Sequence, residues 1–516
     1  MRGSVGPPAC ARSAAYRARV DKRLRALADL DVAEAREGNG RHEYDGIAQD
    51  LSPDAIRRGL DALGNGPVYD DPHDEAHVAA FERRARVTFG ELELHRRNPV
   101  MHVGNLDLAC YDRDYAPAAE RAAAKASHLA AWPDAIDATI AALDAVPAPI
   151  AEASLGAAAG LAAGLDPDEH PAALAAHARL VGHLENAAAT SDVPVQLGAD
   201  GLTALLSGAE ALDVDLSALA DAGEAEVTRL AALLDDACAR IAPGQPTPVT
   251  VAQLLADHPD LDGVLAEARA VTDEVLAWSN ASGLMPPTDG VCLVGPAPES
   301  RRWSMAMMDW AAPYETDAPS WYHVTPPDPG WPATEQAEWL SVFNRSSLPA
   351  ITVHEVAPGH FTHSRALRRL DSDVRRMLLS DAFVEGWAHY VEELALEEGF
   401  RAGDPRFAAG VALEALIRAV RLLCAIGLHT GALTVAEATQ RFTDQAFLSG
   451  AAAASEARRG TFDPTYGRYT WGKLVIRDLR QRARAVPGYT ARGFHDALLA
   501  LGAPPLGLIG SALVLG

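Results

Sequence analysis

Cysteine is scarce in this sequence, and its few copies lie far apart. The 516 residues include five cysteines, with no C-x-x-C pair among them: Cys10, Cys110, Cys238, Cys292 and Cys424. This pattern excludes a disulfide framework and a zinc site built from thiolates. It is typical of a protein in a reducing compartment, so we predict a cytoplasmic location.

Long apolar runs are also missing. A membrane-spanning helix needs about 18 or more consecutive apolar residues, and the sequence contains no such run free of charge. Residues 1–30 hold no apolar block long enough to serve as a signal peptide. We therefore predict a protein that is neither secreted nor inserted in a membrane.

Positive charge is in deficit. The chain has 45 Lys and Arg residues against 70 Asp and Glu residues, a formal net charge of −25. Such a chain repels the phosphates of nucleic acids and the headgroups of anionic lipids, and no basic run offers a local exception. Nucleic acids and membrane surfaces are therefore excluded as expected partners.

Strand patterns are rare, whereas helical patterns dominate. Apolar residues recur three and four positions apart through most of the first 280 residues, as in 114–143 and 223–241. Alternating β-branched and aromatic residues are confined to short pieces such as 291–294 and 321–324. We predict a mainly α fold with a small β element.

Proline and glycine cluster at 285–298 and 312–332, which divides the chain into two parts. The predicted regions are an N-terminal helical one, residues 1–284, that forms one wall of a central cleft, and a C-terminal helical one, residues 285–516, integrated into one structural unit. The stretch between 303 and 322 is rich in Trp, Tyr and Met, so we expect it to be packed. A cleft wall and an ordinary core are equally consistent with that composition.

Residues 354–360 read HEVAPGH, the segment richest in chemical groups. Zinc hydrolases place two histidines of one helix on the metal and a carboxylate beside the water that attacks. Their usual spacing is four residues, whereas His354 and His360 are six apart. An unbroken helix would turn His360 roughly 120° away from the face of His354.

Pro358 and Gly359 allow another path for the chain. Proline removes the amide that would bond the carbonyl oxygen of His354, and glycine tolerates unusual dihedral angles. We therefore expect the helix to bulge or break here, so that His354 and His360 converge on one metal. The alternative is an exposed helix that simply ends at Pro-Gly.

A second helix is expected around residues 380–396. Its buried stripe is predicted to consist of Phe383, Trp387, Tyr390, Val391 and Leu394. Glu385 shares another face with His389 and Glu392, and it follows His360 by 25 residues, enough for a turn and a returning helix. A site with two histidines needs a third ligand, commonly such a carboxylate. His389 and Glu392 would then orient a ligand or meet substrate, unless this face is a solvated polar surface.

Together, the segments HEVAPGH and EGWAHYVE (385–392) resemble a bacterial family catalogued as domain of unknown function 885. The resemblance continues in YTWGKLVIRDLR (469–480) and FHDALLALGAPPL (494–506), and it covers roughly residues 85–516. It implies a gluzincin-like zinc metallopeptidase, distantly similar to thimet oligopeptidase and carboxypeptidase Taq. Two positions depart from the pattern of many members: Phe361 replaces a second histidine, and His389 replaces a leucine.

Carried over by position, the resemblance implies His354, His360 and Glu385 as ligands of one zinc ion and Glu355 as the general base. The spacing of the residues leads to the same four. His363 is the spare ligand, although it lies about 180° from His354 on an ideal helix. Other divalent metals also suit a His/His/Glu set.

An additional donor is expected to stabilise the negatively charged oxygen of the reacting carbonyl. The resemblance favours Tyr469 for this role, with Tyr466 and His389 as rivals. Packing in the core is an equally good explanation for either tyrosine. Three cationic side chains, Lys473, Arg480 and Arg302, are candidates to grip the carboxylate of a peptide, although solvated basic surface is the more common role.

The leading hypothesis is a zinc metallopeptidase that cleaves short peptides. Zinc polarises any amide or ester carbonyl, so an amidase or esterase of non-peptide substrates is an alternative. The unusual spacing of the two histidines motivates the other alternative, a metal-free helical protein that binds a peptide or a partner.

Overall fold

The computed structural model describes residues 21–302, 304–315 and 317–514. It is 66% helix and 3% strand, which confirms the predicted mainly α fold with a small β element. Within the described ranges, no helix is both long and apolar enough to cross a membrane. Residues 1–20 lie outside these ranges, and they include Cys10 and most of the segment that was expected not to be a signal peptide. The other four cysteines are free.

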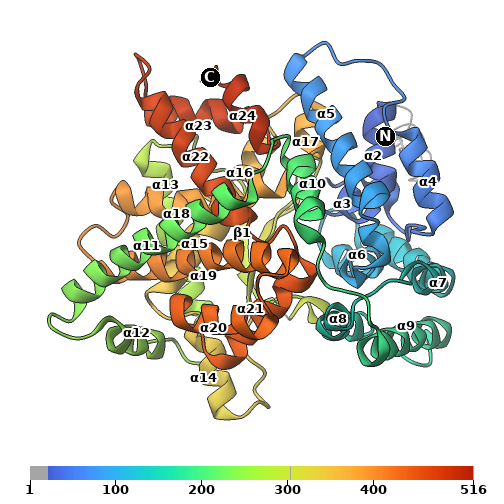
Figure 1. The fold of residues 1–516 in the computed structure, drawn as a ribbon, viewed down its shortest axis with the longest axis horizontal. Coiled ribbons are helices and arrows are strands. Elements are labelled where there is room, and N and C mark those ends of the chain that lie inside the picture. The colour runs from blue at the N-terminus through green and yellow to red at the C-terminus, as the bar shows by residue number, and fades with distance from the viewer. Residues whose placement is uncertain (1–20, 303, 316, 515–516) are drawn as a thin grey trace, which may run out of the picture.

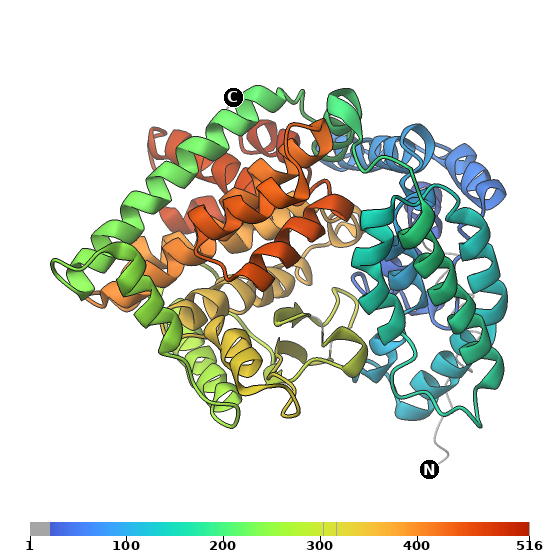
Figure 2. The ribbon, with the colours of Figure 1, turned by 60° about the horizontal axis from the view of Figure 1, so that its bottom comes forward.

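One group of helices, the N-terminal lobe, occupies one side of the molecule (Figures 1 and 2). Its helices are α2 (Lys22–Leu30), α3 (Val32–Arg36), α4 (Pro53–Ala62), α5 (Pro72–Ala85), α6 (Pro99–Leu106), α7 (Ala118–Ala142), α8 (Ala148–Gly160) and α9 (Pro171–Thr190). Two hydrophobic clusters fill this lobe, one among α6 to α9 and the other among α2 to α5.

The remaining helices form the C-terminal lobe on the other side (Figure 2). They are α10 (Gly198–Glu210), α11 (Leu216–Ile241), α12 (Thr247–Ala256), α13 (Val264–Ser282), α14 (Ala333–Ser341), α15 (Ser347–Glu355), α16 (His360–Leu367), α17 (Asp373–Met377), α18 (Asp381–Glu397), α19 (Pro405–Thr430), α20 (Val435–Ala446), α21 (Gly450–Phe462), α22 (Arg468–Arg484), α23 (Ala491–Leu499) and α24 (Leu506–Ala512). Their apolar faces enclose the largest hydrophobic cluster.

A three-stranded sheet lies near the middle of the molecule (Figure 2). Its strands are β1 (Cys292–Gly295), β2 (Ala306–Asp309) and β3 (Ser320–Val324), in the order β1-β3-β2. β1 runs parallel to β3, with Leu293 opposite Trp321, and β2 runs antiparallel to β3, with Met307 opposite His323. β1 and β3 confirm the two expected strand segments, whereas β2 was not predicted.

The largest hydrophobic cluster extends across the predicted boundary at residue 284. Leu202 of α10 and Val264 of α13 belong to the same cluster as the C-terminal helices. The hydrophobic clusters therefore change between α9 and α10. The two lobes also share a core, because Val374 and Met377 of α17 pack among the helices α2 to α5.

Candidate metal centre

The helix that carries the first histidine breaks where Pro358 and Gly359 predict a break. α15 ends at Glu355, and α16 begins at His360. The amide of Gly359 donates to the carbonyl oxygen of Val353, with N and O 3.1 Å apart. A Cβ atom at Gly359 would lie 1.8 Å from the carbonyl oxygen of His354, so only glycine fits this close approach. As a result, the ring centroids of His354 and His360 are 4.7 Å apart.

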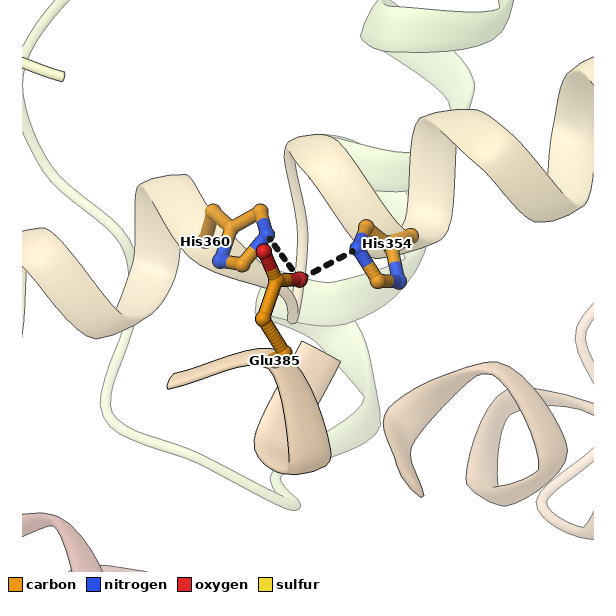
Figure 3. Close-up of side chains that lie close together, drawn as sticks. All are labelled: His354, His360 and Glu385. Atoms are coloured by element: carbon orange, nitrogen blue, oxygen red, sulfur yellow. Dashed lines mark ion pairs between the residues drawn. The ribbon is translucent and has the colours of Figure 1, made fainter. Parts of the chain in front are cut away.

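α18 brings Glu385 to the same point (Figure 3). Its Oε2 atom lies 3.4 Å from Nε2 of His354 and 3.4 Å from Nε2 of His360. In the described part of the chain, these three residues are the one His, Cys, Asp and Glu group whose ligand atoms all lie within 4.8 Å of one another.

This arrangement fits a zinc ion. Two ligand atoms, each about 2.1 Å from a tetrahedral zinc ion, are about 3.4 Å apart. Glu385 Oε2 is buried and has no hydrogen-bond partner among the described residues. A buried carboxylate oxygen needs a hydrogen-bond donor or a cation, and a metal ion would meet that need. Burial alone would raise the pKa of Glu385, but the two imidazoles hold it well below its ordinary value. The carboxylate is therefore charged, as a metal ligand must be.

Glu392, two turns after Glu385 on α18, holds the other nitrogen of His354. Nδ1 of His354 lies 2.7 Å from Oε1 of Glu392, and Glu392 is fully buried. Burial and the charge of Arg418 lower the pKa of His354, but Glu385 and Glu392 overcome both and raise it to about 9. With Nδ1–H donating to Glu392, Nε2 is the atom that faces Glu385.

Two glycines set the position of Glu385. α18 and α22 cross where Gly386 meets Gly472, and a Cβ atom on Gly386 would lie 2.5 Å from Cα of Gly472. A Cβ atom on Gly472 would lie 1.9 Å from the carbonyl oxygen of Ala382. The close crossing brings α22, which carries Tyr469, against the helix that carries Glu385.

Tyr469 adjoins the cluster, whereas Tyr466 is engaged elsewhere. The Tyr469 ring lies 6.3 Å from the His354 ring, with 23° between their planes. Tyr466 is fully buried, and its hydroxyl donates to the carboxylate of Glu456. Of the two tyrosines, Tyr469 is the one placed beside a candidate ligand.

The chain matches the model of a family described as a bacterial protein of unknown function (DUF885) over residues 8–513. It belongs to this family. The match confirms the resemblance found in the sequence, and it spans nearly the whole chain. No curated protein matches it.

Two solved structures share the fold of this DUF885 chain. One is a candidate lipoprotein of unknown function from Shewanella oneidensis, with a TM-score of 0.73 and 17% identity over 97% of this chain and 98% of that one. The other is a candidate lipoprotein from Colwellia psychrerythraea, with a TM-score of 0.77 and 16% identity over 95% and 97% of the two chains. At such identities, the likeness shows the fold alone.

Glu355, the predicted base, is the last residue of α15 and is 9% exposed. Burial raises the pKa of Cys292 to about 12, and the negative charge of Glu355 contributes to this rise. Burial and the same charge also raise the pKa of Tyr322. Glu355 therefore lies near enough to Cys292 of β1 and Tyr322 of β3 for its charge to act on both.

Of the two interpretations of the polar face of α18, the burial of His389 and Glu392 in this DUF885 chain contradicts the solvated surface. His389 and Glu392 are both fully buried, because α18 packs against α15, α16, α19 and α22. Burial, followed by the charge of Lys473, lowers the pKa of His389 to about 3, so its ring is neutral. His389 Nδ1 lies 3.4 Å from Oε1 of Glu392, the same oxygen that contacts the candidate ligand His354.

His363 and the cationic candidates lie apart from the cluster. Nε2 of His363 faces the carbonyl oxygen of Gly502 at 3.3 Å, and among the described residues His363 is outside the group whose ligand atoms lie within 4.8 Å of one another. Lys473 is fully buried and lies within 2.7 Å of carboxylates of Glu226 and Glu393. Arg480 is paired with Glu397 and Glu398 and is 4% exposed, and Arg302 contacts the carbonyl oxygen of Pro326. Neither Lys473 nor Arg480 is free to grip a carboxylate, because both are buried and paired.

A cavity of about 450 Å³ lies between the N-terminal lobe and β2, and Trp310 connects its lining to the cluster. Trp310 lines it, and the Trp310 ring lies 6.0 Å from the His360 ring. Met307 and Met308 of β2 also line the cavity, as do Asp31 and Glu34 of the N-terminal lobe. This position favours the cleft-wall interpretation of the aromatic stretch over ordinary core.

Sequence reasoning missed one charged neighbour of the cluster. Arg418 of α19 is 7% exposed, and its Nη1 atom lies 3.3 Å from Oε2 of Glu392. Nothing in the sequence near residue 418 resembles a catalytic motif. Only the packing of α19 against α15 and α18 brings this arginine behind His354.

Proposed function

We propose that the chain is a zinc-dependent metallopeptidase that cleaves short peptides. The observation that carries this proposal is the convergence of His354, His360 and Glu385, with 3.4 Å between the carboxylate oxygen and each nitrogen. Glu355 directly follows the first of these ligands. A protein that only binds a partner has no chemical need for a base at that position.

Each residue has a distinct part in this proposal. His354 and His360 through Nε2, and Glu385 through Oε2, would hold the ion. When bound, zinc supplies a Lewis acid that polarises the scissile carbonyl and favours the ionisation of water. The carboxylate of Glu355 takes the proton of the attacking water and passes it to the leaving nitrogen. The hydroxyl of Tyr469 donates a hydrogen bond to the carbonyl oxygen as negative charge develops on it.

The sheet and the cavity support a peptide substrate. β2 pairs with β3 and lies at an edge of the sheet, while Met307, Met308 and Trp310 line the cavity. Edge strands present backbone N–H and C=O groups with which an extended peptide can pair. The volume of about 450 Å³ is within the range of small-molecule sites, so it favours short peptides over folded proteins.

The test combines zinc content with peptide hydrolysis. Zinc is measured by plasma mass spectrometry on protein purified without added metal, for wild type, His354→Ala and Glu355→Gln. We expect about one zinc per chain in wild type, loss of zinc and activity in His354→Ala, and retained zinc in Glu355→Gln with turnover lowered by about 100-fold or more. Hydrolysis of a library of short peptides gives the turnover.

Other outcomes contradict specific parts of the proposal. Full activity in Glu355→Gln would overturn the assignment of the base. Wild-type protein that holds no zinc, even after incubation with the metal, would overturn the metal centre and favour a binding protein. Cleavage of simple amides or esters, with no peptide cleaved, would replace the peptidase by an amidase or esterase.

A further inference from the structure

Arg418 touches the groups on two sides of His354. Its Nη1 atom lies 3.3 Å from Oε2 of Glu392, whose other oxygen is 2.7 Å from Nδ1 of His354. Its guanidinium carbon lies 5.9 Å from the centre of the Tyr469 ring, which is stacked beside His354. One side chain of α19 therefore links the edge and the face of the same imidazole.

Glu392 needs a positive partner because it is fully buried. A carboxylate without a cation in the protein interior is strongly unfavourable. In the described part of the chain, its ion-pair contacts are Arg418, His354 and His389, and His389 is neutral. Arg418 is thus the permanently charged partner, and it orients the carboxylate that holds His354.

We infer that Arg418 is a positioning residue for the metal centre. Arg418 fixes the orientation of the His354 ring through Glu392, so that Nε2 of His354 faces Glu385. This inference rests on the proposed zinc site. Groups that hydrogen-bond to a ligating histidine set the orientation and basicity of the ring, and their loss typically costs about 10- to 100-fold in metal affinity. A similar loss is expected when Arg418 no longer holds Glu392.

Arg421 provides a matched control on the same helix. Its guanidinium carbon also lies over the Tyr469 ring, at 5.2 Å, but its Nε and Nη2 atoms bind the carboxylate of Glu456 at 2.8 and 2.9 Å. Arg421→Met therefore removes a cation from beside Tyr469 and leaves the contact between Arg418 and Glu392 in place.

The experiment is a double-mutant cycle on the zinc dissociation constant, measured by competition with a chelator. The proteins are wild type, Arg418→Met, Glu392→Gln, the double variant, Arg418→Lys and Arg421→Met, and thermal unfolding of each metal-free protein checks its fold. We expect Arg418→Met to raise the zinc dissociation constant about 10- to 100-fold. The double variant should bind zinc no more weakly than Glu392→Gln alone, because Arg418 acts through Glu392. Arg418→Lys should recover part of the affinity, and Arg421→Met should bind as wild type does.

Three results would overturn the inference. The first is a zinc dissociation constant of Arg418→Met equal to that of wild type. The second is a loss of zinc affinity from Arg418→Met that is equally large in the wild-type and the Glu392→Gln backgrounds. If Arg418→Met does not fold, Glu392→Gln decides, because unchanged zinc affinity in that variant would show that nothing acts through Glu392. A wild-type chain that binds no zinc is a different result, since it removes the proposed metal centre itself.

Discussion

His354 and His360 are held in different ways, although both face Glu385. Nδ1 of His354 is held by a buried carboxylate, whereas Nδ1 of His360 is buried without a hydrogen-bond partner among the described residues. The charge around His354 favours its protonated form, which raises its pKa to about 9. A metal at Nε2 must therefore displace a proton from His354 at neutral pH.

This competition predicts the pH dependence of zinc binding. Below pH 9 the affinity for zinc should rise by about tenfold for each pH unit, because each binding event releases one proton from His354. In the metal-free protein the sign is opposite. The pKa of His354 is raised above its unfolded value of 6.5, so the stabilisation is complete below pH 6.5 and is lost as the pH rises through about 9. Chelator competition between pH 6 and 9 measures the first effect, and an affinity that does not change with pH would contradict it.

At the scale of single residues, the sequence was sufficient to predict contacts that depend on the local path of the chain. The six-residue spacing with Pro358 and Gly359 was enough to expect that His354 and His360 meet. The roles of Lys473 and Arg480 were misjudged because burial and pairing depend on distant helices: the partners of Lys473 are Glu226 of α11 and Glu393 of α18. Arg418 was missed for the same reason.

Among the helices, the crossing of α18 and α22 determines where Glu385 and Tyr469 lie. Gly386 and Gly472 touch at this crossing, and their side-chain positions are filled by backbone atoms of the other helix. Gly386 therefore serves a close approach of the two helix backbones. The unpredicted strand β2 has the sequence AMMD, without β-branched residues, and only its pairing with β3 makes it a strand.

Gly386→Ala should separate the two helices and displace Glu385. A Cβ atom 2.5 Å from Cα of Gly472 cannot be accommodated without a backbone shift. Overpacking of this kind costs about 1–3 kcal/mol in the free energy of unfolding. We expect that loss in denaturant unfolding, together with a weaker zinc affinity.

Gly182→Ala is the matched control for this change. Gly182 lies in α9, and a Cβ atom there would meet nothing within 4 Å. Alanine at an open helical position should stabilise the protein by about 0.5–1 kcal/mol and leave zinc binding unchanged. Equal effects of the two substitutions would show that the α18–α22 crossing does not position the site.

At the scale of the whole molecule, Glu210 connects helices that are far apart in the sequence. It is the last residue of α10, and it binds the cap of α18, the helix that carries Glu385. Both of its oxygens lie within 2.9 Å of the Ser380 hydroxyl, which caps α18, and Oε2 accepts from the amide of Leu506 at the start of α24. Glu210 is 4% exposed, and burial raises its pKa to about 7. The charge of Arg84 lowers this pKa and the charge of Asp381 raises it. This carboxyl group is therefore a point where pH acts on the packing of α10 against α18 and α24.

Replacing Glu210 with Gln, which resembles the protonated carboxyl group, should remove this pH dependence. The pKa is raised from 4.5 to about 7, so the folded chain keeps a proton that the unfolded chain releases, and wild type loses stability as the pH rises from about 4.5 to 7. The loss amounts to about 3 kcal/mol once the group is ionised. Denaturant unfolding at pH 5 and pH 8 should therefore show Glu210→Gln gaining on wild type at the higher pH. The control is Glu152→Gln, at an exposed position of α8, whose free energy of unfolding should differ from that of wild type by the same amount at both pH values. If Glu210→Gln also differed from wild type by the same amount at both pH values, the role of this buried carboxyl group would be contradicted.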